Sequence, residues 1–126
     1  MIWRNIKNII LNQKYFLNRK IDFEIINGNV KGKVYYGNGK LEFEGEYLNG
    51  KKNGKGKEYF DNGKLRFEGY YLNGKRNGKG KEYSNGKLIF EGEYLNGKRW
   101  NGKEYDYDGK LIYEGEYLNG NRFSFC

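Results

Sequence analysis

Glutamate residues recur in pairs along the chain, with one residue between the two members: Glu44 with Glu46, Glu91 with Glu93, and Glu114 with Glu116. Neighbouring carboxylates can serve general acid and base chemistry or bind a hard cation such as calcium. A catalytic pair needs one asymmetric pocket that separates the two pKa values, and a calcium site needs carboxylates that converge from a loop. Pairs that recur at a fixed interval instead indicate cross-strand contacts with lysine.

Other reactive residue types are scarce in the 126 residues. There is no histidine, and the single cysteine, Cys126, has neither a disulfide partner nor a histidine to activate it. Segments such as Asn49-Gly50-Lys51 resemble phosphate-binding loops only weakly, because they lack the GxxxxGK[ST] pattern and a following helix. We therefore predict that the chain is not an enzyme and that it binds no cofactor and no metal ion.

The elements that must position these residues are repeats. Gly45, Gly69, Gly92 and Gly115 lie 24, 23 and 23 residues apart, each within a close copy of KLEFEGEYLNGK. A fixed period of this size is typical of a stacked array. We predict three parts: a basic, apolar N-terminal segment over 1–14, a degenerate repeat over 15–38, and the main repeat array over 39–126.

Within a repeat, apolar or glycine residues alternate with glutamate from Leu41 to Tyr47, which is the pattern of a strand with one ring-bearing face. Two-residue type I′ turns are predicted between repeats, at Asn38-Gly39, Asn62-Gly63, Asn85-Gly86 and Asp108-Gly109. A wider, glycine-rich loop is predicted inside each repeat, over 49–56 in the first. The fold class is therefore all-β: a single-layer, elongated antiparallel sheet of stacked β-hairpins, with roughly eight to ten strands.

Aromatic rings must supply the cohesion of this sheet, because the chain has too few aliphatic residues to build a second layer. Rings are expected in files on one concave face, with the mid-strand glycines leaving slots for them. The predicted files are Leu41, Leu65, Leu88 and Leu111; Phe43, Phe67, Phe90 and Tyr113; and Tyr47, Tyr71, Tyr94 and Tyr117, joined by Tyr59, Tyr83 and Tyr105 from the alternate strands.

The segments Phe43-Glu44-Gly45-Glu46-Tyr47, Asn49-Gly50-Lys51 and Asn53-Gly54-Lys55-Gly56 resemble the MORN repeat, which has an aromatic-x-Gly-x-aromatic strand, a Gly-Lys loop and a Gly-x-Gly entry to a second strand. The resemblance covers about 15–122. Recurrent Asn-Gly-Lys-Leu is also similar to the MORN variant of YwqK-type antitoxins. Departures from the pattern are Asn53 and Asn77 in place of histidine, a glycine lost near Trp100, and Tyr70 in place of glutamate.

This resemblance implies a non-catalytic scaffold or protein-protein interaction module, whose partner is another protein that the sequence does not identify. The antitoxin variant implies an alternative of the same kind, an antitoxin-like or immunity-type protein that binds its partner. The partner-binding surface is predicted to consist of first-strand rings: Phe43, Tyr47, Phe67, Tyr71, Phe90 and Tyr94.

A second alternative is a peripheral membrane tether that binds anionic phospholipids, since some MORN proteins are associated with such membranes. The basic residues predicted to make this contact are Arg4, Lys7, Lys14, Lys51, Lys52, Lys75 and Arg76. The competing interpretation is that these lysines are solvated and protect hairpin loops and sheet edges from aggregation.

The N-terminal segment differs from the repeats, because 1–20 contain five basic residues and no acidic one. This segment is predicted either to cap the open edge of the sheet, as a decayed strand or a short helix, or to lie on a membrane as a basic amphipathic helix or targeting segment. Most of the net charge of +8 therefore lies in this segment. Because the repeats carry little net positive charge, nucleic acid is a weaker candidate partner than protein.

Location and assembly are predicted only in outline. The sequence shows no secretory signal, no transmembrane span and no paired cysteines, which favours a cytoplasmic protein, with peripheral membrane association in the tether alternative. An exposed terminal strand leaves end-to-end dimerisation open.

Overall fold

The computed structural model describes residues 20–123, which form one antiparallel sheet of ten strands in sequence order. No helix occurs within this described range. The all-β, single-layer prediction is confirmed. The strands are β1 (Lys20–Ile26), β2 (Asn29–Tyr35), β3 (Leu41–Leu48), β4 (Lys51–Tyr59), β5 (Leu65–Leu72), β6 (Lys75–Ser84), β7 (Lys87–Leu95), β8 (Lys98–Tyr105), β9 (Leu111–Leu118) and β10 (Asn121–Arg122).

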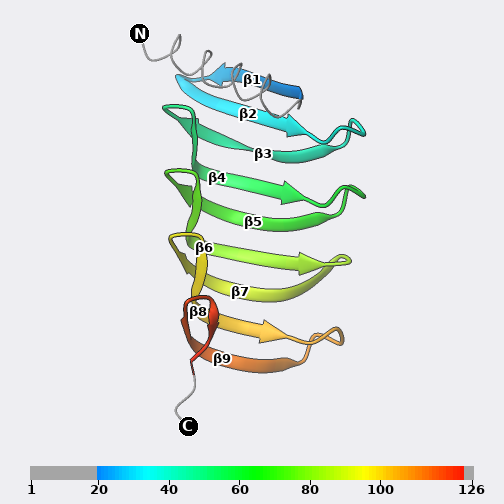
Figure 1. Ribbon diagram of the computed structural model, residues 1–126, viewed down its shortest axis with the longest axis vertical. Coiled ribbons are helices and arrows are strands. Elements are labelled where there is room, and N and C mark those ends of the chain that lie inside the picture. The colour runs from blue at the N-terminus through cyan, green and yellow to red at the C-terminus, as the bar shows by residue number, and fades with distance from the viewer. Residues whose placement is uncertain (1–19, 124–126) are drawn as a thin grey trace.

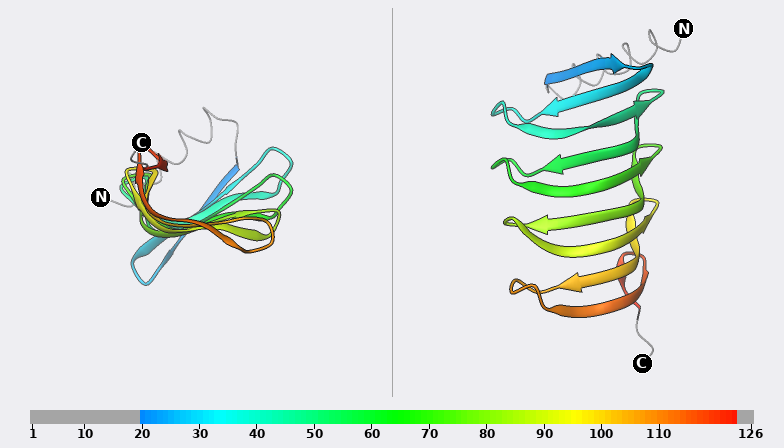
Figure 2. Two further views of the ribbon diagram at one scale, coloured as in Figure 1. Left: turned by 90° about the horizontal axis from the view of Figure 1, so that it is seen from below. Right: turned by 180° about the vertical axis from the view of Figure 1, so that it is seen from behind.

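The strands stack into an elongated ribbon whose long axis runs across them (Figure 1). Each repeat contributes two strands, so equivalent residues recur on every second strand. Seen from below, the strands from green to orange largely overlie one another along a common bend, whereas β1 and β2 cross them at an angle, so that the ribbon is curved and twisted rather than flat (Figure 2). The N-terminal alternatives for 1–14 lie outside the described residues.

The turns differ from the sequence prediction. The turns inside the repeats are tight, because Asn49-Gly50 and its equivalents have positive φ at both residues, as a type I′ turn requires. The predicted wider loop over 49–56 is therefore wrong: β4 begins at Lys51, and the lysines that follow lie on a strand. Between repeats, only Asn85-Gly86 is a two-residue turn, since Ser84 pairs directly with Lys87.

The other three joints between repeats are longer. In the first of them the N–H of Gly39 donates to the carbonyl of Tyr36 (2.9 Å), and the N–H of Tyr36 donates to the carbonyl of Lys40 (2.8 Å). Only the glycine has positive φ, which is the pattern of a type I turn followed by a glycine bulge. The prediction of two-residue turns at Asn38-Gly39, Asn62-Gly63 and Asp108-Gly109 is wrong, because an additional residue precedes each pair in the loop.

These irregularities explain why the period changes from 24 to 23. The shorter joint at Asn85-Gly86 removes one residue between Gly69 and Gly92. A bulge centred on Gly78 places three residues of β6 opposite Tyr70, whereas β8 has a single extra residue, Trp100, at the equivalent place. Despite both changes the central glycines stay in register, Gly80 with Gly92 and Gly92 with Gly102.

The core is a zigzag of rings on one face. Phe43, Phe67 and Phe90 have at most 1% of their surface exposed, and Tyr71 and Tyr94 are buried beside them. Each ring meets the next edge to face, for example Phe67 with Tyr71 at 5.7 Å and with Tyr94 at 5.1 Å between ring centroids. Such contacts contribute about 0.5 to 1.5 kcal/mol each beyond the burial of apolar area.

The rings lie directly on a row of glycines. A Cβ at Gly80 would come within 2.6 Å of the Phe67 ring and 3.0 Å of Tyr94, and one at Gly69 would also meet backbone atoms of β6. Paired glycines therefore run across the sheet, where any side chain would lift the rings away. The prediction that these glycines leave slots for rings is confirmed.

Cations cover the outer side of the rings. The guanidinium carbon of Arg76 lies 4.1 Å from the centroid of Phe67, that of Arg99 lies 4.4 Å from Phe90, and the Lys52 ammonium lies 4.1 Å from Phe43. Each phenylalanine is thus enclosed by glycine backbone below, tyrosine edges at the sides and a cation above. This arrangement buries a ring completely in a single-layer sheet.

Glutamates from the second strand of each repeat link these arginines into a chain. Arg99 donates two hydrogen bonds to the Glu82 carboxylate (2.9 and 2.8 Å) and lies 3.3 Å from a carboxylate oxygen of Glu104. Arg76 is paired in the same way with Glu58 and, at 3.8 Å, with Glu82. Opposite charges therefore alternate along the ring face and hold the arginines over the rings.

Candidate functional site

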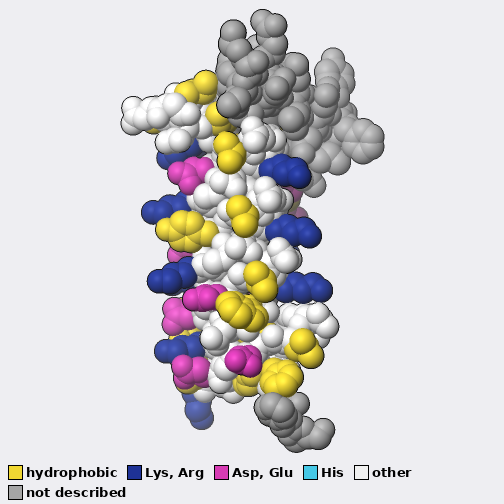
Figure 3. Space-filling model, turned by 90° about the vertical axis from the view of Figure 1, so that its left-hand side faces the viewer, with side chains coloured by type: hydrophobic (Ala, Val, Ile, Leu, Met, Phe, Trp, Pro, Cys, Tyr) yellow, Lys and Arg dark blue, Asp and Glu magenta, His cyan; other side chains and the backbone are white. Residues whose placement is uncertain are grey.

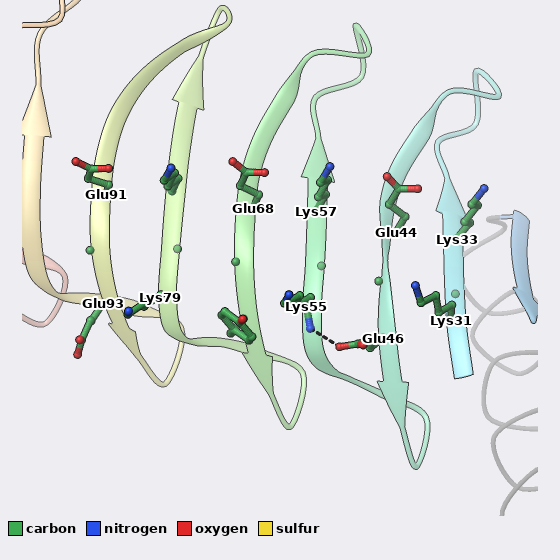
Figure 4. Close-up of a pocket in the computed structure, with 18 of the residues that line it drawn as sticks. Lys31, Lys33, Glu44, Glu46, Lys55, Lys57, Glu68, Lys79, Glu91 and Glu93 are labelled. Atoms are coloured by element: carbon green, nitrogen blue, oxygen red, sulfur yellow. Dashed lines mark hydrogen bonds between the residues drawn. The ribbon is translucent and has the colours of Figure 1, made fainter. Parts of the chain in front are cut away.

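A groove of about 1110 Å³ runs across the sheet on the face opposite the rings. The backbone of the glycine row lines it together with lysine and glutamate side chains from the strands on both sides (Figure 4). The sequence analysis predicted that the ring face is the concave one. The groove instead lies on the opposite face. The ring face is filled by its own rings and their arginines. On the opposite face, rows of side chains stand on either side of the glycines, and the glycine backbone between them is open.

Charges alternate along the groove in a first row on one side of the glycines. Each lysine in this row pairs in register with a glutamate or aspartate on both neighbouring strands, as Lys57 does with Glu44 and Glu68. In Figure 4, Glu44, Glu68 and Glu91 lie in line on alternate strands. The full row is Asp22, Lys33, Glu44, Lys57, Glu68, Lys81, Glu91, Lys103 and Glu114. The predicted cross-strand ladder of glutamate and lysine is confirmed.

Tyrosines fix the glutamates of this first row. The hydroxyl of Tyr59 donates to Glu44 (2.7 Å) and that of Tyr83 donates to Glu68 (2.7 Å), and Tyr105 binds Glu91 in the same way (2.6 Å). Burial, and then the hydrogen bond and charge of the glutamate, raise the pKa of Tyr59 to about 12. The expectation that Tyr59, Tyr83 and Tyr105 join the ring files is wrong. Each of them follows a groove lysine by two residues on the same strand, so its side chain lies on the glutamate face.

The second row, on the other side of the glycines, does not alternate throughout. Lys31 pairs with Glu24 and Glu46, and Lys79 pairs with Glu93, but Lys55 pairs with Tyr70, which is 42% exposed. Between Glu93 and Glu116 stands Asn101 in place of a lysine. The second row is therefore short of a carboxylate in its middle and short of a cation toward β9.

The rings predicted to contact a partner are mostly inside the structure. Phe43, Phe67, Phe90, Tyr71 and Tyr94 belong to the buried core, and Tyr47 packs against it with part of its surface exposed. Burial raises the pKa of Tyr47 to about 12. The structure gives these rings a packing role, and their contact with a partner stays a prediction.

The basic residues predicted to bind lipid are separated by the structure. Arg76 is engaged by two glutamates over a ring, and Lys52 lies over Phe43, whereas Lys51 and Lys75 are exposed where their strands begin. Arg4, Lys7 and Lys14 lie outside the described residues. Lipid binding by this set stays a prediction.

An exposed column of leucines borders the turns inside the repeats. Leu72, Leu95 and their equivalents are each about half exposed, and each is followed three residues later by Lys or Asn at the start of the next strand. Figure 3 faces this edge and shows hydrophobic side chains at intervals down its length, with Lys and Arg on both sides. The leucines of the column are Leu48, Leu72, Leu95 and Leu118.

Sequence reasoning missed both the groove and this column. The lysines that line the groove, such as Lys55 and Lys57, were expected in a loop, although their alternation with Gly54 and Gly56 has the period of a strand. Leu48 and its equivalents follow the last core tyrosine directly, which places them on the other face by the same period.

No cluster of three or more aspartate, glutamate, histidine or cysteine side chains that could hold a metal ion occurs over 20–123. Over the same range, no helix is long and apolar enough to cross a membrane.

Two variants of one repeat family match the chain. Residues 43–64 and 67–87 match the MORN repeat, and 29–49 and 101–119 match a MORN repeat variant. No curated protein matches the chain. The matched segments lie between β2 and β9, with 88–100 outside them, and together cover more than half of the sequence. The chain therefore belongs to the MORN-repeat family.

Proposed function

We propose that the chain is a non-catalytic interaction module that binds a segment of a partner protein in the groove. The observation that supports this most is the groove itself, about 1110 Å³ in volume and bounded by strands from β1 to β9. Its lysines and glutamates are not needed to enclose the rings, which lie on the other face. The antitoxin-like alternative falls within this proposal, since an antitoxin of this kind also binds a partner protein.

A polar groove of this kind suits a peptide segment. Its walls offer ammonium and carboxylate groups in regular rows, which can pair with side chains of either charge and fix the register of a bound chain. Several of the glutamates are already held by tyrosine hydroxyls, as Glu68 is by Tyr83. Such preorganised side chains lose less conformational freedom on binding than free ones do.

Site-specific photo-crosslinking tests the proposal. A photoreactive amino acid is placed at Lys57 or Lys81, which line the groove, and in matched controls at Lys64 or Lys110, which are exposed at joints between repeats. Extract of the organism that carries the gene is irradiated with each variant. We expect one dominant crosslinked protein from both groove positions and not from the joints. Equal crosslinking from groove and joint positions, or none from the groove, would refute groove binding.

A second candidate function, binding to anionic membranes, is favoured by the leucine column. Leu72 and Leu95 are exposed beside Lys75 and Lys98, so that apolar and basic side chains share one edge. Anionic lipid contributes about 1 kcal/mol per basic residue near the surface. We expect wild-type protein to sediment with phosphatidylserine vesicles at low salt, and a Leu72→Ser, Leu95→Ser variant to sediment less than an Ile112→Ser control. Binding that is absent or insensitive to salt contradicts this candidate.

A further inference from the structure

The middle of the groove lacks a carboxylate that the neighbouring repeats have. In the first repeat, the Glu46 carboxylate accepts a hydrogen bond from the backbone N–H of Lys55 (2.6 Å), beside the bulge at Gly54 (Figure 4). Tyr70 stands at the place of Glu46 in the second repeat, next to the equivalent bulge at Gly78. A tyrosine has no carboxylate to accept a hydrogen bond from the N–H of Lys79.

The same substitution unbalances the local charge. β4 and β6 each line the groove with two lysines, whereas β5 between them contributes a single glutamate, Glu68. By contrast, β3 and β7 each contribute two glutamates. Glu68 also accepts the hydrogen bond from Tyr83 and pairs in register with lysines on both sides. The lysines of the second row, Lys55 and Lys79, are therefore the ones left without a glutamate between them.

Tyr70 shapes this place without closing it. The ammonium of Lys55 lies 5.9 Å from the centroid of the Tyr70 ring, a weak cation–π distance, and the ring is 42% exposed. The Tyr70 ring and the Lys55 ammonium thus border an open position in the groove, and Lys79 lines the groove on the next strand.

We infer that Lys55, Tyr70 and Lys79 form a notch that binds the carboxylate of an aspartate or glutamate side chain from the partner segment in the groove. The inference rests on the proposed function. The ligand carboxylate takes the place that glutamate occupies in the neighbouring repeats, and the Tyr70 ring packs against its methylene groups. Carboxylate is favoured over phosphate because the equivalent positions, Glu46 and Glu93, hold carboxylates.

The test uses the full chain and a hexaglutamate peptide, with hexaglutamine as the uncharged control. Amide resonances of the ¹⁵N-labelled protein are followed during titration at low salt. Tyr70→Glu restores the residue of the other repeats and should fold as well as the wild type. Tyr107→Glu adds the same charge at a residue that is 62% exposed and does not line the groove.

We expect hexaglutamate to shift the amide signals of Lys55, Gly78 and Lys79, and hexaglutamine to leave them in place. Tyr70→Glu should weaken hexaglutamate binding by about tenfold or more, because it fills the position with a negative charge, whereas Tyr107→Glu should change it by less than about twofold. A Lys79→Gln variant should also weaken it. An equal loss in Tyr70→Glu and Tyr107→Glu would show an effect of net charge alone and would overturn the inference, as would shifts confined to other parts of the chain.

The outcome is distinguishable from that of the crosslinking experiment. If groove crosslinks to a partner persist unchanged in Tyr70→Glu, the groove binds a partner but the notch holds no acidic side chain, and the inference fails alone. If hexaglutamate binds at the notch while the groove positions crosslink no partner, the notch stands and the proposed function fails.

Discussion

Replacing a glycine of the central row by alanine tests whether the rings lie directly on the backbone. At Gly69, a Cβ would stand 2.5 Å from the carbonyl oxygen of Lys79, 2.7 Å from the Cα of Gly80 and 2.8 Å from Phe67. The first two are backbone atoms of the paired strand, so no side-chain rotation relieves them. Phe67 cannot withdraw either, because Arg76 lies over its other side at 4.1 Å.

The expected cost follows from these contacts. Inserting a methyl group into a filled site costs about 1 to 3 kcal/mol, and the contacts with backbone atoms place Gly69→Ala toward the upper end. Alanine also reduces the entropy of the unfolded chain, which offsets about 0.4 to 1 kcal/mol. We expect Gly69→Ala to lower the free energy of unfolding by about 2 kcal/mol net.

Two other glycines separate the possible causes. A Cβ at Gly37 would meet no atom within 4 Å, and this glycine has no positive φ, so Gly37→Ala should leave stability unchanged or raise it by up to about 1 kcal/mol. Gly63 also has open space but a φ of +90°, so Gly63→Ala should cost about 1 to 2 kcal/mol through backbone strain alone.

Urea unfolding followed by far-ultraviolet circular dichroism gives the three values, and the denaturant slope shows whether cooperativity is kept. The decisive comparison is Gly69→Ala against Gly37→Ala. If both variants were as stable as the wild type, the rings would not lie against the glycine row, and the account of how a single layer encloses its core would be refuted.

Three further results are expected. Arg99→Ala uncovers Phe90 and leaves Glu82 without its two hydrogen bonds from Arg99, so it should lower the free energy of unfolding by about 2 kcal/mol. Arg99→Lys should lower it by about 1 kcal/mol, since lysine keeps the charge but not the two-pronged guanidinium; equal losses of the two variants in urea unfolding would contradict this. Burial alone would raise the pKa of Glu82, but hydrogen bonds from Arg99 and Tyr94 bring it below its ordinary value of 4.5. The stabilising effect of Glu82 is therefore present above pH 4.5 and is lost as the pH falls through the lowered value. In thermal unfolding, Glu82→Gln should lose less stability on acidification than the wild type does. Burial and the hydrogen bond to Glu68 raise the pKa of Tyr83 from 10.0 to about 12, so its contribution is complete below pH 10 and is lost as the pH rises toward 12, and Tyr83→Phe should reduce this alkaline loss.

Local periodicity was enough to predict the sheet. The alternation from Leu41 to Tyr47 identified the strands, the ring face and the glycine slots, because each depends only on which face a residue occupies. The glutamate and lysine ladder follows from the same alternation when neighbouring strands are antiparallel. These features are fixed within one hairpin, which is why one repeat was sufficient to predict them.

Features that depend on irregularities between strands were not predictable in this way. A bulge at Gly54 sets three residues of β4 opposite Glu46, and the register shift between Glu58 and Tyr59 places Tyr59 opposite Leu65. A one-residue change of register exchanges the faces of every following side chain. The sequence shows the glycines but not on which strand the additional residue will be accommodated.

The arginine cover was missed for a different reason. Arg76 was considered as a surface charge and Arg99 was not singled out, because a count of basic residues does not show which of them lie over a ring. Their partners, Glu58 and Glu82, come from strands of the same and the preceding repeat, and the contacts exist only when the hairpins are stacked. Burial of Phe67 and Phe90 depends on this longer-range geometry.

The orientation of the groove sets a length scale for anything that lies along it. Equivalent side chains recur on every second strand, and with neighbouring strands about 4.8 Å apart this spacing is about 10 Å. An extended polypeptide advances by that distance in about three residues, and an α-helix in about six to seven. A ligand with charges at every third position of an extended chain would therefore stay in phase with the lysines from β4 to β8, whereas an extended chain with charges at every second or every fourth position would lose phase within two repeats.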